Sequence, residues 1–147
     1  MSATSASPST PLVAGITQAD AAAYGIMILR VSMGAMMMAH GLIKVFLFTP
    51  AGFIRYFGSM GLPEPFAWFV MAAEVLGGAA LLLGVYTRIV AAAFVPHLIG
   101  ATLMVHASKG FMAGNPGGGW EFPAFWAAAL VAQVLLGDGA WALRRWR

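Results

Sequence analysis

Residues 66–85 read FAWFVMAAEVLGGAALLLGV, an apolar run whose only charged side chain is Glu74. A helix that crosses the hydrocarbon core of a bilayer needs roughly 20 consecutive apolar residues. The length and composition of this run therefore predict a membrane-spanning helix with one carboxyl group near its middle.

Three more apolar stretches lie outside this run, at residues 21–48, 88–108 and 120–141. The whole chain of 147 residues is 61% hydrophobic and 9% charged, whereas soluble domains have about 45–50% apolar and 25% charged residues. In lipid, each spanning helix must satisfy its own backbone hydrogen bonds. We therefore expect an all-α fold, an integral membrane antiparallel four-helix bundle over residues 21–143.

Two short segments complete the predicted organisation. Residues 1–20 are small, polar and proline-containing, and they predict a disordered N-terminal tail, after which Thr17 or Asp20 caps the first helix. Thr49 and Pro50 are a helix-start signal, so a short amphipathic helix is expected on the membrane surface between the first two spans. Residues 144–147 form a basic C-terminal end.

The distribution of basic residues predicts an orientation in the bacterial inner membrane. Lysine and arginine are enriched in the cytoplasmic loops of membrane proteins. With alternating spans, one face carries Arg88, Arg144, Arg145 and Arg147, with Arg30 nearer to it, and the other carries Lys44, Arg55 and Lys109. Both termini are therefore expected in the cytoplasm.

Charge and cysteine content limit the function. The net charge of +3 comes from too few basic residues for a nucleic-acid surface, so we expect no nucleic-acid partner. The chain has no cysteine, which excludes a disulfide, a thiol nucleophile or a Cys-ligated iron–sulfur cluster. The expected partners are the lipid bilayer and either protein subunits or further copies of the chain.

Polar residues inside the spans define a candidate site. At about 100° per residue, His40 and Lys44 fall within about 80° of Arg30 on one helix face. Glu74 lies roughly 13 Å into the second span, where a charge is costly and indicates a functional site. Because consecutive spans alternate in direction, one pocket is expected to gather His40, Lys44, Glu74, His106, Lys109 and Glu121. His97 precedes His106 by nine residues, about 180° around a regular helix, and is expected to point elsewhere.

The same residues carry a family resemblance. The chain has His40-Gly-Leu-Ile-Lys44, Glu74 followed by Gly77-Gly78, Gly84-Val-Tyr-Thr-Arg88, and His106 followed by Lys109-Gly110. In this order and spacing, together with Gly61-Leu-Pro63 and Glu121, the pattern resembles the DoxX family of four-helix membrane proteins over residues 26–143. The resemblance implies the bundle fold and a link to quinone-dependent oxidation, because some members are small subunits associated with quinone-linked oxidation of sulfur compounds.

Two functions follow from these observations. One is a membrane redox-accessory protein that binds a quinone-like lipophilic ligand at the His/Lys/Glu pocket and serves a partner oxidoreductase. The other is a non-catalytic structural or assembly subunit, in which the polar cluster only fixes the bundle. Haem between His40 and His106 is a weaker alternative. Soft-metal binding is also weaker, because the five methionines of the first span do not share one face, and no metal site is expected.

Overall fold

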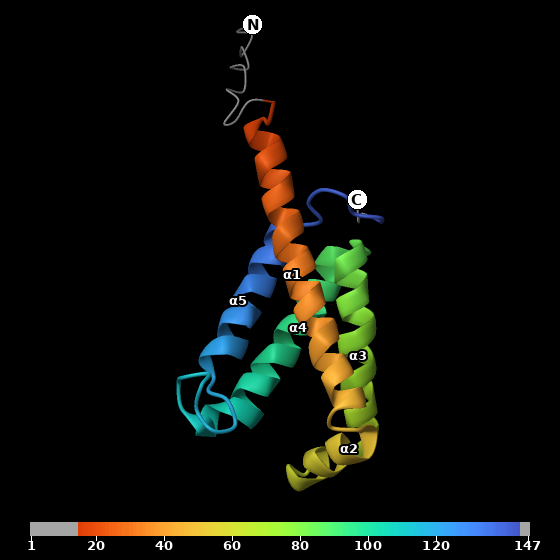
Figure 1. Ribbon diagram of the computed structural model, residues 1–147, viewed down its shortest axis with the longest axis vertical. Coiled ribbons are helices and arrows are strands. Elements are labelled where there is room, and N and C mark those ends of the chain that lie inside the picture. Colours follow the sequence, from red (N-terminus) through yellow and green to blue (C-terminus); the bar gives the residue numbers. More distant parts are fainter. Residues whose placement is uncertain (1–14, 145–147) are drawn as a thin grey trace, which may run out of the picture.

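The computed structural model describes residues 15–144, and its regular elements within that range are helices (Figure 1). The all-α fold class is therefore confirmed. The elements are α1 (Gln18–Phe46), α2 (Pro50–Ser59), α3 (Glu64–Leu83), α4 (Thr87–Ala101), the π turn η1 (Thr102–His106), the 3₁₀ turn η2 (Ala107–Lys109) and α5 (Glu121–Leu136).

Three helices in this range are long and apolar enough to span a membrane. They are α1, α3 and the continuous segment Thr87–Lys109 that α4 forms with its two terminal turns. The apolar α5 has 16 residues, about 24 Å, which is shorter than the roughly 30 Å of a bilayer core. The predicted fourth span, 120–141, thus ends too late, because Gly137 and Gly139 have positive φ angles that end the helix.

The helices pack mainly in two pairs, α1 with α3 and α4 with α5. Figure 1 shows the two pairs separating toward the end of the molecule that carries α2 and the loop after η2. The short helix α2 follows the predicted Thr49–Pro50 start and buries Phe53 and Phe57 against α3. It therefore closes one side of the space between the pairs.

Glycines allow α1 and α3 to approach closely. A Cβ atom on Gly34 would lie 2.8 Å from the Gly78 carbonyl oxygen, and one on Gly78 would lie 2.5 Å from the Met38 backbone nitrogen. Small residues permit such backbone contact in lipid, where no hydrophobic force drives helix association. This close packing fixes how the side chains of α1 face those of α3 one turn further along, at the candidate site.

The start of α1 follows from local capping. The Thr17 hydroxyl accepts a hydrogen bond from the Asp20 backbone nitrogen at 3.2 Å, and the Asp20 carboxylate accepts one from the Thr17 backbone nitrogen at 3.3 Å. The helix consequently begins at Gln18, three residues inside the predicted tail of 1–20. The rest of that predicted tail, residues 1–14, lies outside the described range, as do residues 145–147 of the basic end.

At the end of the molecule opposite α2, a buried arginine joins three segments. Arg30 is 1% exposed and donates to the carbonyl oxygens of Leu81, at 3.4 Å, and Ala140, at 2.9 Å. The segment after α5 also pairs with the α3–α4 turn, since the Arg144 nitrogen donates to the Gly84 oxygen at 3.0 Å. Between this end and α2 lies an apolar core centred on the fully buried Met37, Leu81 and Leu130.

Candidate functional site

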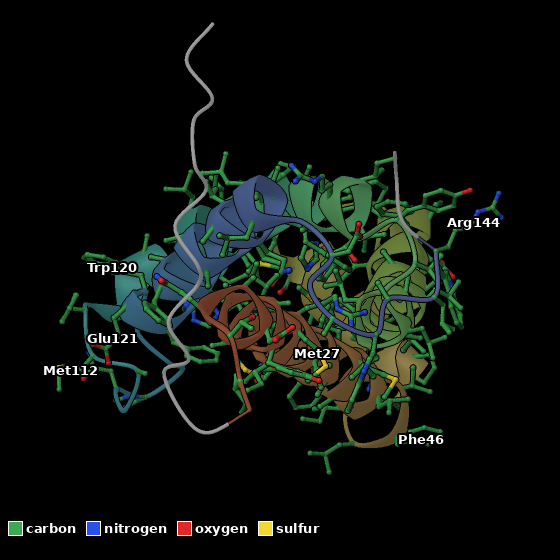
Figure 2. The ribbon with its side chains drawn as sticks, turned by 90° about the horizontal axis from the view of Figure 1, so that it is seen from above. Met27, Phe46, Met112, Trp120, Glu121 and Arg144 are labelled. Carbon is green, nitrogen blue, oxygen red and sulfur yellow. The ribbon has the colours of Figure 1, made fainter. Side chains whose placement is uncertain are left out.

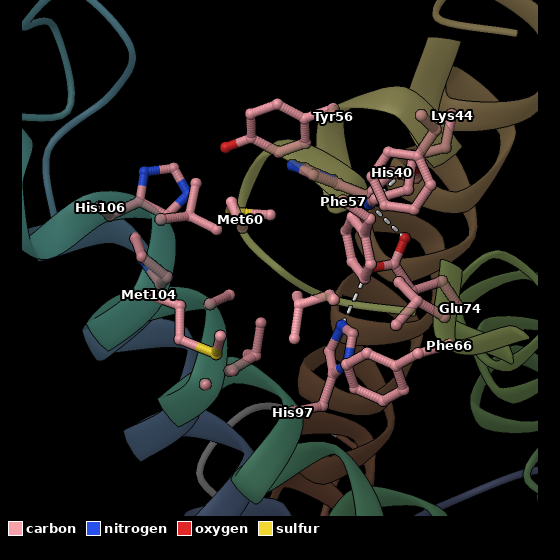
Figure 3. Close-up of a pocket in the computed structure, with 18 of the residues that line it drawn as sticks. His40, Lys44, Tyr56, Phe57, Met60, Phe66, Glu74, His97, Met104 and His106 are labelled. Atoms are coloured by element: carbon pink, nitrogen blue, oxygen red, sulfur yellow. Dashed lines mark hydrogen bonds and ion pairs between the residues drawn. The ribbon is translucent and has the colours of Figure 1, made fainter. Parts of the chain in front are cut away.

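A cavity of about 690 Å³ lies between α1, α2, α3, α4 and the start of α5 (Figure 3). Its wall is mainly apolar and aromatic. The ionisable or hydroxyl-bearing side chains that line it are His40, Lys44, Tyr56, Glu74, His97 and His106. This volume is in the range of pockets that hold a small organic molecule.

Glu74 is the centre of the polar wall. It is 4% exposed, and each of its carboxylate oxygens has a partner from a different helix. Lys44 Nζ of α1 lies 2.5 Å from Oε2, and His97 Nε2 of α4 lies 2.9 Å from Oε1. The carboxylate thus links α1, α3 and α4 near the middle of α3.

His40 lies one turn before Lys44 on α1, beside the aromatic rings of α5. Its Nδ1 is 2.9 Å from the Met36 carbonyl oxygen. Its ring stacks with Phe122 at 6.3 Å between centroids and meets Trp126 edge-on at 5.1 Å. The backbone bond and the two rings fix the orientation of this imidazole.

His106 ends the π turn and faces the cavity from the α4 side, opposite His40 in Figure 3. Its Nδ1 lies 2.9 Å from the carbonyl oxygen of Gly118 in the glycine-rich loop. Gly118 has φ +75°, a conformation that other residues rarely adopt. The loop therefore has a structural purpose, because its unusual backbone presents a carbonyl group to His106.

Four of the six residues predicted for the pocket line it: His40, Lys44, Glu74 and His106. Lys109 and Glu121 do not. Glu121 Oε1 accepts from the Ala113 backbone nitrogen at 2.7 Å, beside Met112 at the margin of the molecule (Figure 2). Lys109 is exposed and packs its methylene groups on Gly117. The prediction placed these two side chains at the same level as the pocket, but both contact the loop between η2 and α5 instead and do not point inward.

The prediction that His97 points away from the site is wrong. It assumed 100° per residue over the nine residues to His106, but the π turn Thr102–His106 lies between them. A π bulge takes up about one extra residue, so the net rotation is nearer eight α-helical steps, about 80°. Both histidines can then face one cavity, with His97 about 13 Å deeper along the helix. Pro96 lies inside the regular helix α4 and does not mark the π turn, so the available sequence signal for His97 was an ionisable residue within an apolar span.

The arrangement combines an apolar space with a hydrogen-bonded proton-carrying chain at its wall. Within residues 15–144 there is no cluster of three or more His, Asp or Glu side chains placed to hold a metal ion. Histidine beside a carboxylate is a suitable pair for accepting and delivering protons. The site can therefore bind a lipophilic molecule and exchange protons with its polar end.

Comparison with known proteins fits this placement. Residues 25–107 match the model of the DoxX family, and this stretch contains all six of the ionisable or hydroxyl-bearing residues that line the pocket. The chain is also 40% identical over 88 residues to a Bacillus subtilis (strain 168) protein named "Putative oxidoreductase CatD", an alignment that covers 60% of this chain and 64% of the relative. No solved structure matches the chain. The family match covers more than half of the sequence, and the chain belongs to the DoxX family of membrane proteins.

Proposed function

We propose that this protein binds a quinone-like lipophilic ligand in the cavity beside Glu74 and serves a partner oxidoreductase in the bacterial inner membrane. The observation that carries the proposal is the Lys44–Glu74–His97 chain, which forms one wall of an otherwise apolar pocket of about 690 Å³. The name of the Bacillus subtilis relative, "Putative oxidoreductase CatD", supports a redox role for this chain.

A quinone matches both parts of the pocket. Its flat ring and apolar tail suit the aromatic lining, in which Phe57, Phe66 and Phe122 take part. Its oxygens suit the polar wall. Conversion between quinone and hydroquinone moves protons together with electrons, and Glu74 with His97 and His40 offers proton-exchanging groups next to the ring. The electrons pass to or from the partner oxidoreductase.

The first test is the composition of the purified protein. We expect lipid extracts of the protein, prepared in a mild detergent, to contain quinone enriched severalfold over the membrane from which it came. Glu74→Gln and Lys44→Met should lower that enrichment, because each breaks the polar wall. Glu64→Gln is the matched control, since Glu64 lies on the same helix, is exposed and does not line the cavity.

Three results would contradict the proposal. If the quinone content of the purified protein equalled that of the bulk membrane, quinone would not be its ligand. If the protein purified without quinone but with other protein subunits in stoichiometric amounts, the structural or assembly role would be favoured instead. A Soret absorption band in the purified protein would show that haem occupies the histidines.

A further inference from the structure

Helices α3 and α4 are in close contact on one side of Glu74 and separate on the other. Toward the basic end, a Cβ atom on Gly77 of α3 would lie 2.5 Å from the Phe94 ring of α4, so the two helices pack tightly there. About one turn further along, Glu74 and His97 are joined by the 2.9 Å contact between Oε1 and Nε2. Beyond it, the cavity wall continues on α4 with Gly100, where a Cβ atom would meet no described atom within 4 Å. The open space between the helices therefore begins at the Glu74–His97 contact.

Two rows of residues border this space. Residues three or four apart lie on one face of a helix. Two rows with this spacing line the cavity, Phe66, Val70 and Glu74 on α3 and His97, Gly100 and Met104 on α4 and η1. At the outer ends of the rows, Phe66 is 41% exposed and Met104 is 54% exposed, and Figure 3 shows the two on opposite sides of the cavity. The space thus runs from the polar wall to the surface of the protein.

The other sides of the cavity are closed more fully. Between α1 and α5, the His40 ring contacts the rings of Phe122 and Trp126, at 6.3 and 5.1 Å between centroids. Helix α2 buries Phe53 and Phe57 against α3 and has at most sparse contact with α4. The described helices therefore cover the cavity less between α3 and α4 than between α1 and α5.

This opening lies at the depth of the lipid tails. Both α3 and the segment Thr87–Lys109 are long enough to span a bilayer. The two rows extend over about 10–12 Å from the Glu74–His97 contact, and their outer residues Phe66, Gly100 and Met104 are apolar. An apolar chain that moves from lipid into such a space exchanges one apolar environment for another, whereas a polar group loses hydrogen bonds there.

We infer that the cavity opens directly into the bilayer between α3 and α4, and that its ligand lies there with its polar ring at Glu74 and an apolar tail along Gly100 and Met104. This inference rests on the proposed function and specifies its ligand, which is a long-tailed molecule that stays in the membrane and not a water-soluble aromatic compound. Gly100 is the position that determines this specificity, because the absence of a side chain there leaves room for the tail.

The first experiment locates the tail. The probe is a benzoquinone with a decyl tail that carries a diazirine at its middle, bound to the whole protein in lipid nanodiscs and activated by light. Mass spectrometry should find the label on Phe66, Gly100 or Met104, and an excess of plain decyl benzoquinone should prevent this labelling. Competed label found only on α5 or on Phe48 would overturn the inference, because the tail would then leave on the other side.

The second experiment fills the opening. Gly100→Phe should weaken binding of decyl benzoquinone, measured by calorimetry in nanodiscs, by at least about fivefold, and Gly100→Leu should weaken it less. Binding of the same benzoquinone without its tail should change by about twofold or less, because the polar wall is intact.

Gly25→Phe is the matched control. Gly25 is exposed on α1, does not line the cavity, and like Gly100 has no described atom within 4 Å of an added Cβ. The two phenylalanine variants should unfold at the same concentration of sodium dodecyl sulfate, which separates a blocked opening from a misfolded protein. Gly25→Phe should bind decyl benzoquinone like the parent.

The outcomes separate this inference from the proposed function. Decyl benzoquinone that binds Gly100→Phe as tightly as the parent would overturn the inference while the quinone-like ligand stands. An equal loss of the tailed and the tailless compound would overturn it as well, because the substitution would then act at the polar ring. A tailless compound that binds the parent too weakly to measure would support the contribution of the tail, and the cross-linked residues then decide its path. Failure of both compounds to bind the parent would overturn the proposed function and the inference together.

Discussion

Among single residues, Glu74 is a buried carboxylate that side chains from two other helices hold in place. It is 4% exposed and holds Lys44 and His97 on its two oxygens. A buried ion pair adds little stability over an apolar replacement of both partners, but removing one partner leaves a buried charge uncompensated. A buried ion pair of this kind is therefore better explained by a role in the site than by a role in holding the bundle together.

Glu74→Ala is expected to lower the free energy of unfolding by about 3–5 kcal/mol, because Lys44 loses its counter-charge inside the protein. Glu74→Gln should cost less, about 1–3 kcal/mol, since the amide still hydrogen-bonds. Titration with sodium dodecyl sulfate followed by circular dichroism measures both. Glu64→Ala, at an exposed site on the same helix, serves as the control. Equal unfolding curves for all three variants would contradict a stabilising ion pair at Glu74.

Gly84 is the second residue whose environment allows a direct test. It ends α3 at φ +67°, and a Cβ atom there would overlap the Arg30 guanidinium and Ala142. We expect Gly84→Ala to displace Arg30 from the Leu81 and Ala140 carbonyl oxygens and to destabilise the protein by about 2–4 kcal/mol. In an Arg30→Leu background the same change should cost less, leaving about 1 kcal/mol of backbone strain and the remaining overlap.

Purely additive losses in this double-mutant cycle would mean that Gly84 and Arg30 act independently. The same detergent titration provides all four unfolding free energies. Gly58→Ala is a suitable control, because a Cβ atom on Gly58 would meet nothing within 4 Å.

At the scale of elements, the π turn of residues 102–106 determines which side chains of α4 meet in the cavity. Such turns are rare in proteins as a whole, but those that do occur are often found at functional sites. By taking up one extra residue, this turn brings His106 to the same side of the segment as His97. Whether His106 and His97 line the same cavity therefore depends on a local irregularity of one helix.

Deletion of Leu103, whose side chain is 66% exposed, is expected to convert the π turn into regular α-helix and keep His106 in the pocket. Insertion of an alanine after Leu103 adds a residue that the turn cannot take up, and should rotate His106 away by about 100°. Quinone enrichment in the purified protein should then be retained in the deletion and lowered at least about fivefold in the insertion. Similar binding by both variants, with helix content unchanged in circular dichroism, would contradict this account of the turn.

At the scale of the whole molecule, the two ends differ in their chemistry. Arg30, Arg88 and Arg144 lie at the end where α1 begins and α5 finishes, and Arg88 donates to the Val134 oxygen at 3.0 Å. Guanidinium groups at the C-terminal ends of α3 and α5 interact favourably with the helix dipoles. The cavity lies toward the other end, with the apolar core around Met37, Leu81 and Leu130 between them.

The basic end should face the cytoplasm. Because the chain contains no cysteine, single substitutions report sidedness without background. In intact cells, a membrane-impermeant maleimide should label Ser59→Cys and Ser108→Cys at the α2 end, and should label Gln18→Cys and Arg144→Cys only after permeabilisation. The reverse pattern would invert the orientation, and labelling of Gln18→Cys and Arg144→Cys from different sides would refute a common face for the two ends.

Most of the helices, and the carboxyl group in the middle of the second span, could be predicted from the amino-acid sequence. Apolar length and low charge predicted the spans near residues 21–48, 66–85 and 88–108, because the bilayer imposes one length and one composition on any helix that crosses it. Local signals also predicted the Thr17 cap and the Thr49–Pro50 helix start. Helical phase placed His40 and Lys44 on one face, since α1 is regular over that stretch.

Which side chains complete the site depends on tertiary packing and could not be predicted from the sequence. A π turn, which 100° periodicity does not anticipate, brings His106 to the same side as His97 and its partner Glu74, whereas Glu121 and Lys109 are held by the glycine-rich loop. The end of α5 depends on glycines that turn the chain back onto Arg30. Composition and periodicity are properties of one segment, but these outcomes depend on the packing of several segments against one another, where a shift of one residue changes the face that a helix presents.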